Sequence, residues 1–254
     1  MLEGEQISSA SPRILETTTV RLVLAGVLVD APDAVGTVVV LGDSITDGAG
    51  ATLDADTRWP DLLARRAAPR GIAVINAGIS GARLLSDGMG NAALARMDRD
   101  VLAQPGVRTL ILMLGTNDIA WPGTPFDPNA PPVTFETIIT GYRAVVARAH
   151  ANGVRVVGAT LPPFRGALPD TPLSATYYSA TKDALRARVN DWIRNSGTFD
   201  SVVDYDSVLA DPARPDHLLP AFDSGDHLHP GDAGNQAMAD AIDLTTLIGE
   251  TNGP

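Results

Sequence analysis

The sequence predicts an α/β fold, a three-layer α/β/α sandwich with a central, mostly parallel sheet of five strands. Short apolar runs alternate with longer segments of helical spacing along most of the chain, as in successive β-α-β units. The clearest run is β-branched and apolar without alternation, as in strands that are buried on both faces. At 254 residues with no break in composition, the chain is long enough for one large domain.

The predicted domain covers residues 36–254, and residues 1–35 form a predicted N-terminal extension. Within this extension, residues 1–16 suggest an extended lead, and residues 20–29 fit an edge strand or hairpin arm that could remain from a lost domain. Residues 1–11 have neither the basic nor the apolar region of a secretory signal. Both a cytoplasmic and a secreted location therefore stay open.

The elements follow in order along the domain. Strands are predicted over residues 37–41, 72–75, 108–114, 154–160 and 199–205. Helices are predicted over residues 59–66, 91–103, 135–151, 176–195 and 232–248, and Asp232 is the expected N-cap of the last one. Residues 120–134 and 161–173 are proline-rich loops, and residues 206–228 are mostly loop with a short helix.

Composition excludes several classes of protein. A hydrophobic content of 44% with 19% charged residues is typical of a globular protein, and no apolar stretch reaches the length of a membrane span. The net charge of −11, without a basic run, argues against a nucleic-acid partner, because such binding depends on clustered Lys and Arg. Since the chain has no cysteine, it has no thiolate nucleophile, thiolate metal ligand or disulfide.

Polar residues follow three of the predicted strands directly. Ser44 comes after the first strand, a glycine-rich turn over residues 78–81 after the second, and Asn117 after the third. The carboxyl ends of parallel strands meet at one edge of a sheet, where ligands bind in open α/β folds. A serine at this edge can be a nucleophile, although serine and glycine are also ordinary turn residues.

The four histidines differ in their surroundings. His229 follows Asp226 by three residues in a short loop, a spacing that allows the carboxylate to orient the imidazole. His150 lies at the end of a predicted helix, where a cation is favourable, and His217 has no nucleophile paired with it. His227 is expected to point away from His229 as a surface or packing residue.

Together the four segments resemble the four sequence blocks of the SGNH, or GDSL, hydrolase family. Residues 42–45 (Gly-Asp-Ser-Ile) match its nucleophile block with isoleucine in place of the usual leucine, and residues 76–81 (Asn-Ala-Gly-Ile-Ser-Gly) are similar to the second block. Residues 115–118 (Gly-Thr-Asn-Asp) resemble the third block and residues 226–229 (Asp-His-Leu-His) the last. The resemblance spans about residues 36–248.

This resemblance implies a flavodoxin-like sandwich that hydrolyses carboxylic esters of small molecules without a metal or cofactor. Ser44 would be the nucleophile, His229 the general base and then acid, and Asp226 the residue that orients the imidazole. The amides of Ser44 and Gly81 and the side chain of Asn117 would form the oxyanion hole. Short-chain or aryl esters, acetylated sugars, lysophospholipids and thioesters all fit this chemistry.

The polar neighbours of these residues are expected to have structural roles. Asp43, Asn76 and Asp118 would brace the loops through hydrogen bonds. Arg83 would either meet an anionic group or brace its loop. The aromatic residues of the two proline-rich loops would either line a substrate pocket or pack in the core: Trp121, Phe126 and Phe164.

Two other functions compete with a serine esterase. Asp226, His227 and His229 could bind zinc for metal-assisted hydrolysis, but this interpretation leaves Ser44, Gly81 and Asn117 without a role. The chain could also be a carbohydrate- or lipid-binding module that has lost catalysis. The complete set of nucleophile, base, acid and donors argues against both.

Overall fold

The computed structural model describes residues 28–248, and the residues from Ala34 onward belong to one compact unit. Most of the predicted N-terminal extension lies outside the described residues, including residues 20–27 of the expected edge strand. Residues 28 and 29, its last two positions, have no regular structure. The division of the chain at residue 36 therefore stays a prediction.

A five-stranded parallel sheet forms the centre of the unit, in the order β2-β1-β3-β4-β5. Its strands are β1 (Gly36–Gly42), β2 (Ile72–Gly78), β3 (Val107–Met113), β4 (Arg155–Ala159) and β5 (Ser201–Val203). All four pairings within the sheet are parallel. The predicted five-stranded sheet is confirmed, and β5 is shorter than the run that predicted it.

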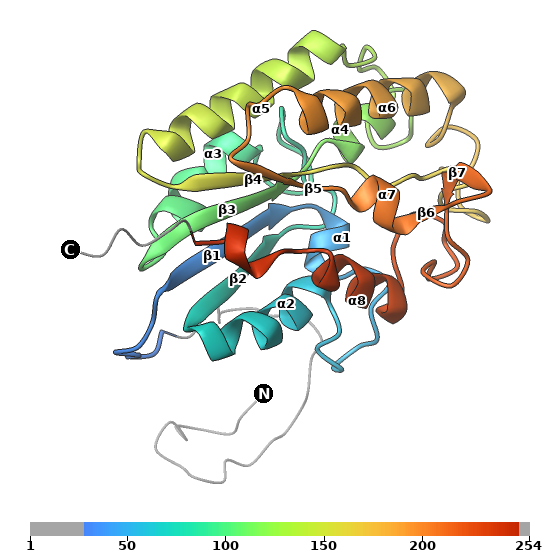
Figure 1. The fold of residues 1–254 in the computed structure, drawn as a ribbon. Coiled ribbons are helices and arrows are strands. Elements are labelled where there is room, and N and C mark those ends of the chain that lie inside the picture. The colour runs from blue at the N-terminus through green and yellow to red at the C-terminus, as the bar shows by residue number, and fades with distance from the viewer. Residues whose placement is uncertain (1–27, 249–254) are drawn as a thin grey trace, which may run out of the picture. The chain divides into compact units, whose positions relative to one another are not determined.

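Alternate side chains of the central strands enter two separate cores. Val39 and Leu41 of β1 pack in one apolar cluster, whereas Val38 and Val40 pack in another on the opposite face. Because both faces are buried, β1 reads as a continuous apolar run with no polar alternation. Helices α3 to α6 lie over one face, and α2 and α8 lie over the other (Figure 1). The three predicted layers are confirmed.

The helices of the first face are α3 (Ala93–Met97), α4 (Thr116–Ala120), α5 (Phe135–His150) and α6 (Ala180–Asn195). A π-helical turn, Asp98–Leu102, continues α3, so the predicted helix over residues 91–103 is two short pieces. Helix α6 starts four residues later than predicted because the side chain of Ser179 caps it by accepting from the amide of Lys182. Residues 176–179 are thereby left in the loop that precedes α6.

The other helices are α1 (Ser44–Asp47), α2 (Trp59–Ala67), α7 (Tyr205–Leu209) and α8 (Asp232–Asp240), with 3₁₀ turns at Ala68–Arg70 and Leu244–Thr246. Helix α8 ends well before residue 248. The prediction that Asp232 caps it is wrong, because Gly231 is the N-cap. Asp232 instead accepts hydrogen bonds from Thr52 and Thr57 in a distant loop.

A small antiparallel hairpin of β6 (Ala210–Asp211) and β7 (Arg214–Leu218) lies within the segment that was predicted to be mostly loop. Its sequence is polar and contains a proline, so the usual period of a strand is missing. This hairpin forms a separate two-stranded sheet beyond α7 (Figure 1).

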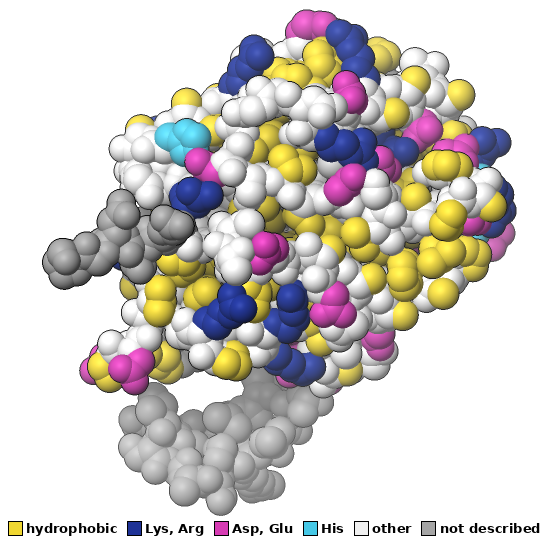
Figure 2. All heavy atoms as spheres, viewed as in Figure 1, with side chains coloured by type: hydrophobic (Ala, Val, Ile, Leu, Met, Phe, Trp, Pro, Cys, Tyr) yellow, Lys and Arg dark blue, Asp and Glu magenta, His cyan; other side chains and the backbone are white. Residues whose placement is uncertain are grey.

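The described surface mixes both signs of charge. Basic and acidic side chains lie beside each other over the face in Figure 2, and no large area of that face is uniformly basic. Exposed ion pairs such as Arg148 with Asp98 and Arg188 with Glu136 account for part of this mixing. Within the part of the chain that the structure describes, no helix has the length and apolar character needed to cross a membrane.

Candidate active site

The predicted nucleophile stands where β1 ends and α1 begins. Ser44 is the first residue of α1, and Asp43 caps this short helix by accepting a hydrogen bond from the amide of Ile45 at 3.1 Å. The side chain of Asp43 is buried, and this burial raises its pKa to about 6, although the hydrogen bond from Ile45 acts in the opposite direction. The bracing role expected of Asp43 is confirmed.

The second block forms the turn after β2. Asn76 donates to the carbonyl of Thr46 at 2.7 Å and accepts from the amide of Gly78, so it ties β2 to helix α1. Gly81 has φ near +74°, a left-handed conformation that favours glycine, and an added Cβ would collide with the side chain of Met89. This turn therefore requires glycine at the position predicted to donate an amide.

A buried arginine supports the same turn, and the sequence did not single it out. Arg96 of α3 donates to the carbonyls of Gly42 and Ala77, the residues near the ends of β1 and β2. Its side chain is fully buried, and an ion pair with Asp100 at 3.2 Å partly balances the charge. A single arginine in an otherwise ordinary amphipathic helix carries no signal that predicts this contact.

The third block places Asn117 in the first turn of α4, where only 4% of the residue is exposed. Its Nδ2 donates to the carbonyl of Ala82 at 3.1 Å, and its Oδ1 accepts from the hydroxyl of Tyr177 at 3.0 Å. Asp118 accepts from the amides of Leu84 and Leu85, as expected of a bracing residue. Burial raises the pKa of Asp118 above its usual value.

The last block brings the predicted base and acid to Ser44. His229 Nε2 lies 2.8 Å from Ser44 Oγ, and His229 Nδ1 lies 2.5 Å from Asp226 Oδ2. Partial burial acts to raise the pKa of Asp226, but the hydrogen bonds and charge of His229, with the amide of Leu228, hold it well below its usual value. Three residues that are up to 185 positions apart thus form one hydrogen-bonded chain.

The loop of His229 is held from behind by buried polar contacts. Asn235 of α8 donates to the carbonyl of Pro230 at 2.9 Å and accepts from the amide of Trp59 at 2.9 Å. On the other side, an added Cβ at Gly50 would meet the carbonyl of Pro230 and the Cβ of His229. The loop therefore has little room to move relative to α2.

The predicted oxyanion donors lie just after the carboxyl ends of three neighbouring strands, β1, β2 and β3. Within the described residues, the backbone amides of Ser44 and Gly81 donate to no protein acceptor. The Nδ2 of Asn117 has two protons and donates one of them to Ala82. Each of the three groups can therefore give a further hydrogen bond.

The other histidines each pair with a carboxylate of their own. His150 contacts Asp200 at 2.8 Å, and His217 contacts Asp216 at 2.7 Å. His227 contacts Asp223 and is about half exposed, as expected for a surface residue.

The zinc alternative finds no converging ligands. His229 uses both ring nitrogens for Ser44 and Asp226, while Nδ1 of His227 faces Asp223. Among residues 28–248, no group of three or more His, Cys, Asp or Glu side chains has an arrangement that could hold a metal ion.

A cavity of about 440 Å³ lies next to the third block, between Asp118 and the proline-rich loop that includes Pro131 and Pro132. Arg83 borders this cavity, but it is bound to Asp127 at 2.7 Å and to the carbonyl of Asp87, so it braces the loops.

The aromatic residues of the two proline-rich loops mainly contribute to packing. Trp121 is buried and lies against Phe126 with ring centres 4.7 Å apart, while Phe164 is fully buried beside Tyr177. Core packing, one of the two roles expected of Trp121 and Phe164, is therefore the one observed.

Ser44, His229 and Asp226 form one hydrogen-bonded chain at the carboxyl edge of a parallel sheet. This arrangement is found in serine hydrolases. The model of the GDSL-like lipase/acylhydrolase family matches residues 40–237, and the chain belongs to this family. The matched residues contain all four sequence blocks.

Solved structures share the fold. A GDSL-like lipase from Bacteroides thetaiotaomicron is 19% identical, with a TM-score of 0.58, and the match covers 83% of this chain and 87% of that one. A lipase/acylhydrolase from Enterococcus faecalis is 22% identical, with a TM-score of 0.57 and coverage of 82% and 93%. A variant of an acetyl-xylooligosaccharide esterase from Geobacillus stearothermophilus is 25% identical, with a TM-score of 0.57 and coverage of 85% and 95%. No curated protein sequence matched the chain.

Proposed function

We propose that this protein is a serine esterase that hydrolyses carboxylic esters through an acyl-enzyme. Ser44 is the nucleophile, His229 the general base and acid, and Asp226 the residue that orients the imidazole. The single observation that carries the proposal is the contact of 2.8 Å between Ser44 Oγ and His229 Nε2, continued by the contact of 2.5 Å between His229 Nδ1 and Asp226.

The first step follows from this geometry. Asp226, which stays ionised, accepts the Nδ1 proton and leaves Nε2 as the basic atom that faces Ser44. His229 removes the hydroxyl proton as Ser44 Oγ attacks the ester carbonyl. The negative charge that develops on the carbonyl oxygen is met by the amides of Ser44 and Gly81 and by the second proton of Asn117 Nδ2.

The protonated His229 then gives its proton to the leaving alcohol, and the ester bond breaks to leave an acyl group on Ser44. Water replaces the alcohol, and His229 activates it to hydrolyse the acyl-enzyme. Apart from the ester and water, every step uses only groups of this chain. The membership in a family of lipases and acylhydrolases supports esters as the substrates.

Labelling with a serine-directed phosphonate tests the proposal. The phosphonate should abolish ester hydrolysis and add its mass to the peptide that carries Ser44, and Ser44→Ala should remove both activity and labelling. Ser80→Ala is the matched control, because the Ser80 hydroxyl donates to Asp47 and should leave labelling at Ser44 intact. Loss of activity on chelation without loss of labelling would contradict the proposal.

A further inference from the structure

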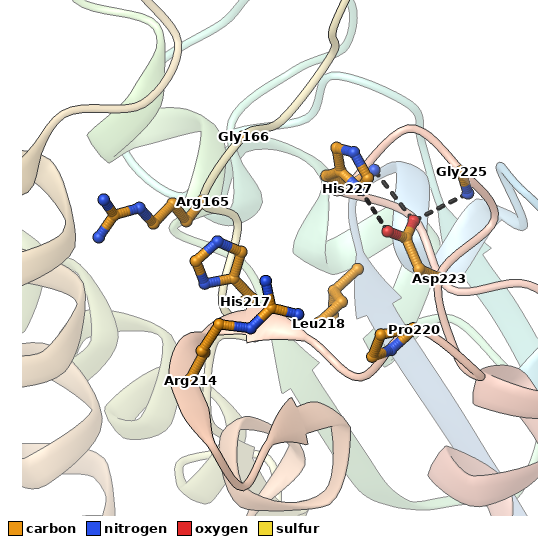
Figure 3. A pocket seen from close by; sticks show the side chains of 9 residues that line it. All are labelled: Arg165, Gly166, Arg214, His217, Leu218, Pro220, Asp223, Gly225 and His227. Carbon is orange, nitrogen blue, oxygen red and sulfur yellow. Dashed lines mark hydrogen bonds and ion pairs between the residues drawn. The ribbon is translucent and has the colours of Figure 1, made fainter.

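A cavity of about 510 Å³ lies beside the loop that carries Asp226 and His229. Its walls come from β7, from Arg165 and Gly166 in the loop after β4, and from the segment over residues 220–227 (Figure 3). The volume falls within the range of about 300–1,000 Å³ that is usual for small-molecule pockets. None of the predicted site residues lines this cavity.

The chemistry proposed above gives this cavity a place in the reaction. His229 passes its proton to the oxygen of the leaving alcohol, so the alcohol part of the ester must lie on the histidine side of Ser44. His227, two residues before His229, lines the cavity, and an added Cβ on Gly166 would lie 3.5 Å from the His227 ring. The cavity therefore lies against the same loop that carries His229.

Three polar side chains at this cavity are each held on one side by a carboxylate. Arg214 binds Asp211 through Nε and Nη2, and the Nδ1 atoms of His217 and His227 contact Asp216 and Asp223. Figure 3 shows the guanidinium of Arg214 and the ring of His217 close together, with His227 across the cavity from them. Arg214 Nη1 and the two Nε2 atoms are left to meet a ligand, and the fixed partners lower the entropic cost of ordering these side chains.

The charges around the cavity favour a neutral ligand. Arg165 and Arg214 supply two positive charges. Their ion-pair partners, Asp216 and Asp211, together with Asp223, which contacts His227, supply three negative charges. When the two histidines are left out of the count, the local sum of charges is therefore slightly negative, in a chain of net charge −11. An anion gains little from such a site, despite the two arginines.

The hydrogen-bonding groups favour hydroxyls. An imidazole whose Nδ1 contacts a carboxylate keeps its Nε2 atom for a further hydrogen bond, while a guanidinium can only donate. A hydroxyl group donates and accepts at once, so neighbouring hydroxyls on one ring can satisfy both kinds of partner. Leu218 and Pro220 add apolar surface for the C–H face of such a ring.

We propose that this cavity binds the hydroxyl-rich alcohol part of the substrate, so that the substrate class is an O-acylated sugar whose glycosyl unit contacts Arg214, His217 and His227. This inference rests on the proposed esterase function of Ser44. It names the leaving group of the ester.

Two acetate esters with alcohols of the same ring size test the inference: a monoacetylated methyl xyloside, which retains ring hydroxyls, and cyclohexyl acetate, which has none. The ratio of their kcat/KM values should favour the sugar ester in the wild-type protein. Arg214→Met and His217→Phe should each lower this ratio by about tenfold, as expected for the loss of one hydrogen bond that involves a charged or polarised partner. Arg188→Met is the control and should leave the ratio unchanged. Among the described residues, the only ion pair of Arg188, a residue of α6, is with exposed Glu136.

Thermal unfolding of each variant shows whether the two substitutions in the β6–β7 hairpin leave the protein folded. If both variants are folded and neither changes the ratio, the cavity does not hold the alcohol and the inference is wrong. A selective loss of activity on acetyl glycerol 3-phosphate would instead identify an anionic ligand and also overturn it. Hydrolysis that survives Ser44→Ala would refute the esterase proposal itself. This result differs from the two outcomes above, which overturn only the assignment of the cavity.

Discussion

The hydroxyl of Tyr177 donates a hydrogen bond of 3.0 Å to Oδ1 of Asn117, and both side chains are buried. Because burial raises the pKa of Tyr177 well above its ordinary value, the phenol keeps its proton and can act only as the donor toward this oxygen. The contact therefore fixes which end of the Asn117 amide is oxygen and which is nitrogen. The Nδ2 end, which donates to Ala82, is the end that the proposed oxyanion requires.

Tyr177→Phe should lower kcat by about tenfold with little change in KM, because Asn117 loses the partner that orients its amide while the ground-state contacts of the substrate remain. Steady-state kinetics with p-nitrophenyl acetate measure both constants. Tyr142→Phe is the matched control, since it removes a buried hydroxyl that donates to the carbonyl of Leu114. If the two variants lose stability equally and Tyr177→Phe keeps full kcat, Tyr177 has only a packing role.

Asn117→Ala should lower kcat by a factor on the order of 10² to 10³, the usual effect of removing one oxyanion donor. The loss should fall on kcat more than on KM, because the hydrogen bond strengthens as charge develops on the carbonyl oxygen. A double variant with Tyr177→Phe should be no slower than Asn117→Ala alone. A further, multiplicative loss in the double variant would show that Tyr177 does not act through Asn117.

Asp226→Asn should lower kcat by up to about 10⁴-fold, since an amide at this position no longer holds the imidazole proton on Nδ1 and stabilises the imidazolium poorly. Asp200→Asn is a suitable comparison, because Asp200 forms a similar pair with His150 at a distant surface site. Turnover at saturating ester should fall only in the first variant. Equal activity of both variants would leave Asp226 without the proposed role.

Asp43→Asn should make the free energy of unfolding less dependent on pH. The folded protein holds the Asp43 proton up to about pH 6, whereas the unfolded chain releases it near 3.8. Asp43 therefore favours folding below about pH 4, and this contribution, about 3 kcal/mol, is lost as the pH rises to 6.

Relative to wild type, Asp43→Asn should gain stability at pH 7.5 and show a smaller difference at pH 4. Urea unfolding at the two pH values measures this, with Asp191→Asn as the control, because Asp191 is an exposed residue of α6. An equal difference between variant and wild type at both pH values would mean that burial of the Asp43 carboxylate costs nothing.

The sheet and the positions of polar residues at the ends of its strands were predictable because both depend on local patterns. Buried parallel strands such as β1 are continuous apolar runs, and the polar residue that ends each run falls at the carboxyl edge of the sheet. The spacing of Asp226 and His229 is likewise a property of one short loop. These features need no knowledge of which distant segments meet.

Errors occurred where a distant contact overrides a local preference. Asp232 has the side chain of a helix cap, but Thr52 and Thr57 of a distant loop engage its carboxylate. The β6–β7 hairpin has no apolar alternation, and one of its contacts with a distant segment is the hydrogen bond from the amide of Arg165 to the carbonyl of Asp216. Such outcomes depend on competition between partners, which propensity alone does not describe.

The amino-acid sequence alone predicts the α/β class and the order of the strands and helices. It also shows which residue types are available for acyl transfer. The tertiary structure alone shows that Tyr177, 60 positions from Asn117, orients its amide, and that β7 and the loop after β4 enclose a cavity beside His227. The reason is physical. Periodicity and strand ends are encoded within a few neighbouring residues, whereas a hydrogen bond between loops exists only once the core has placed those loops together.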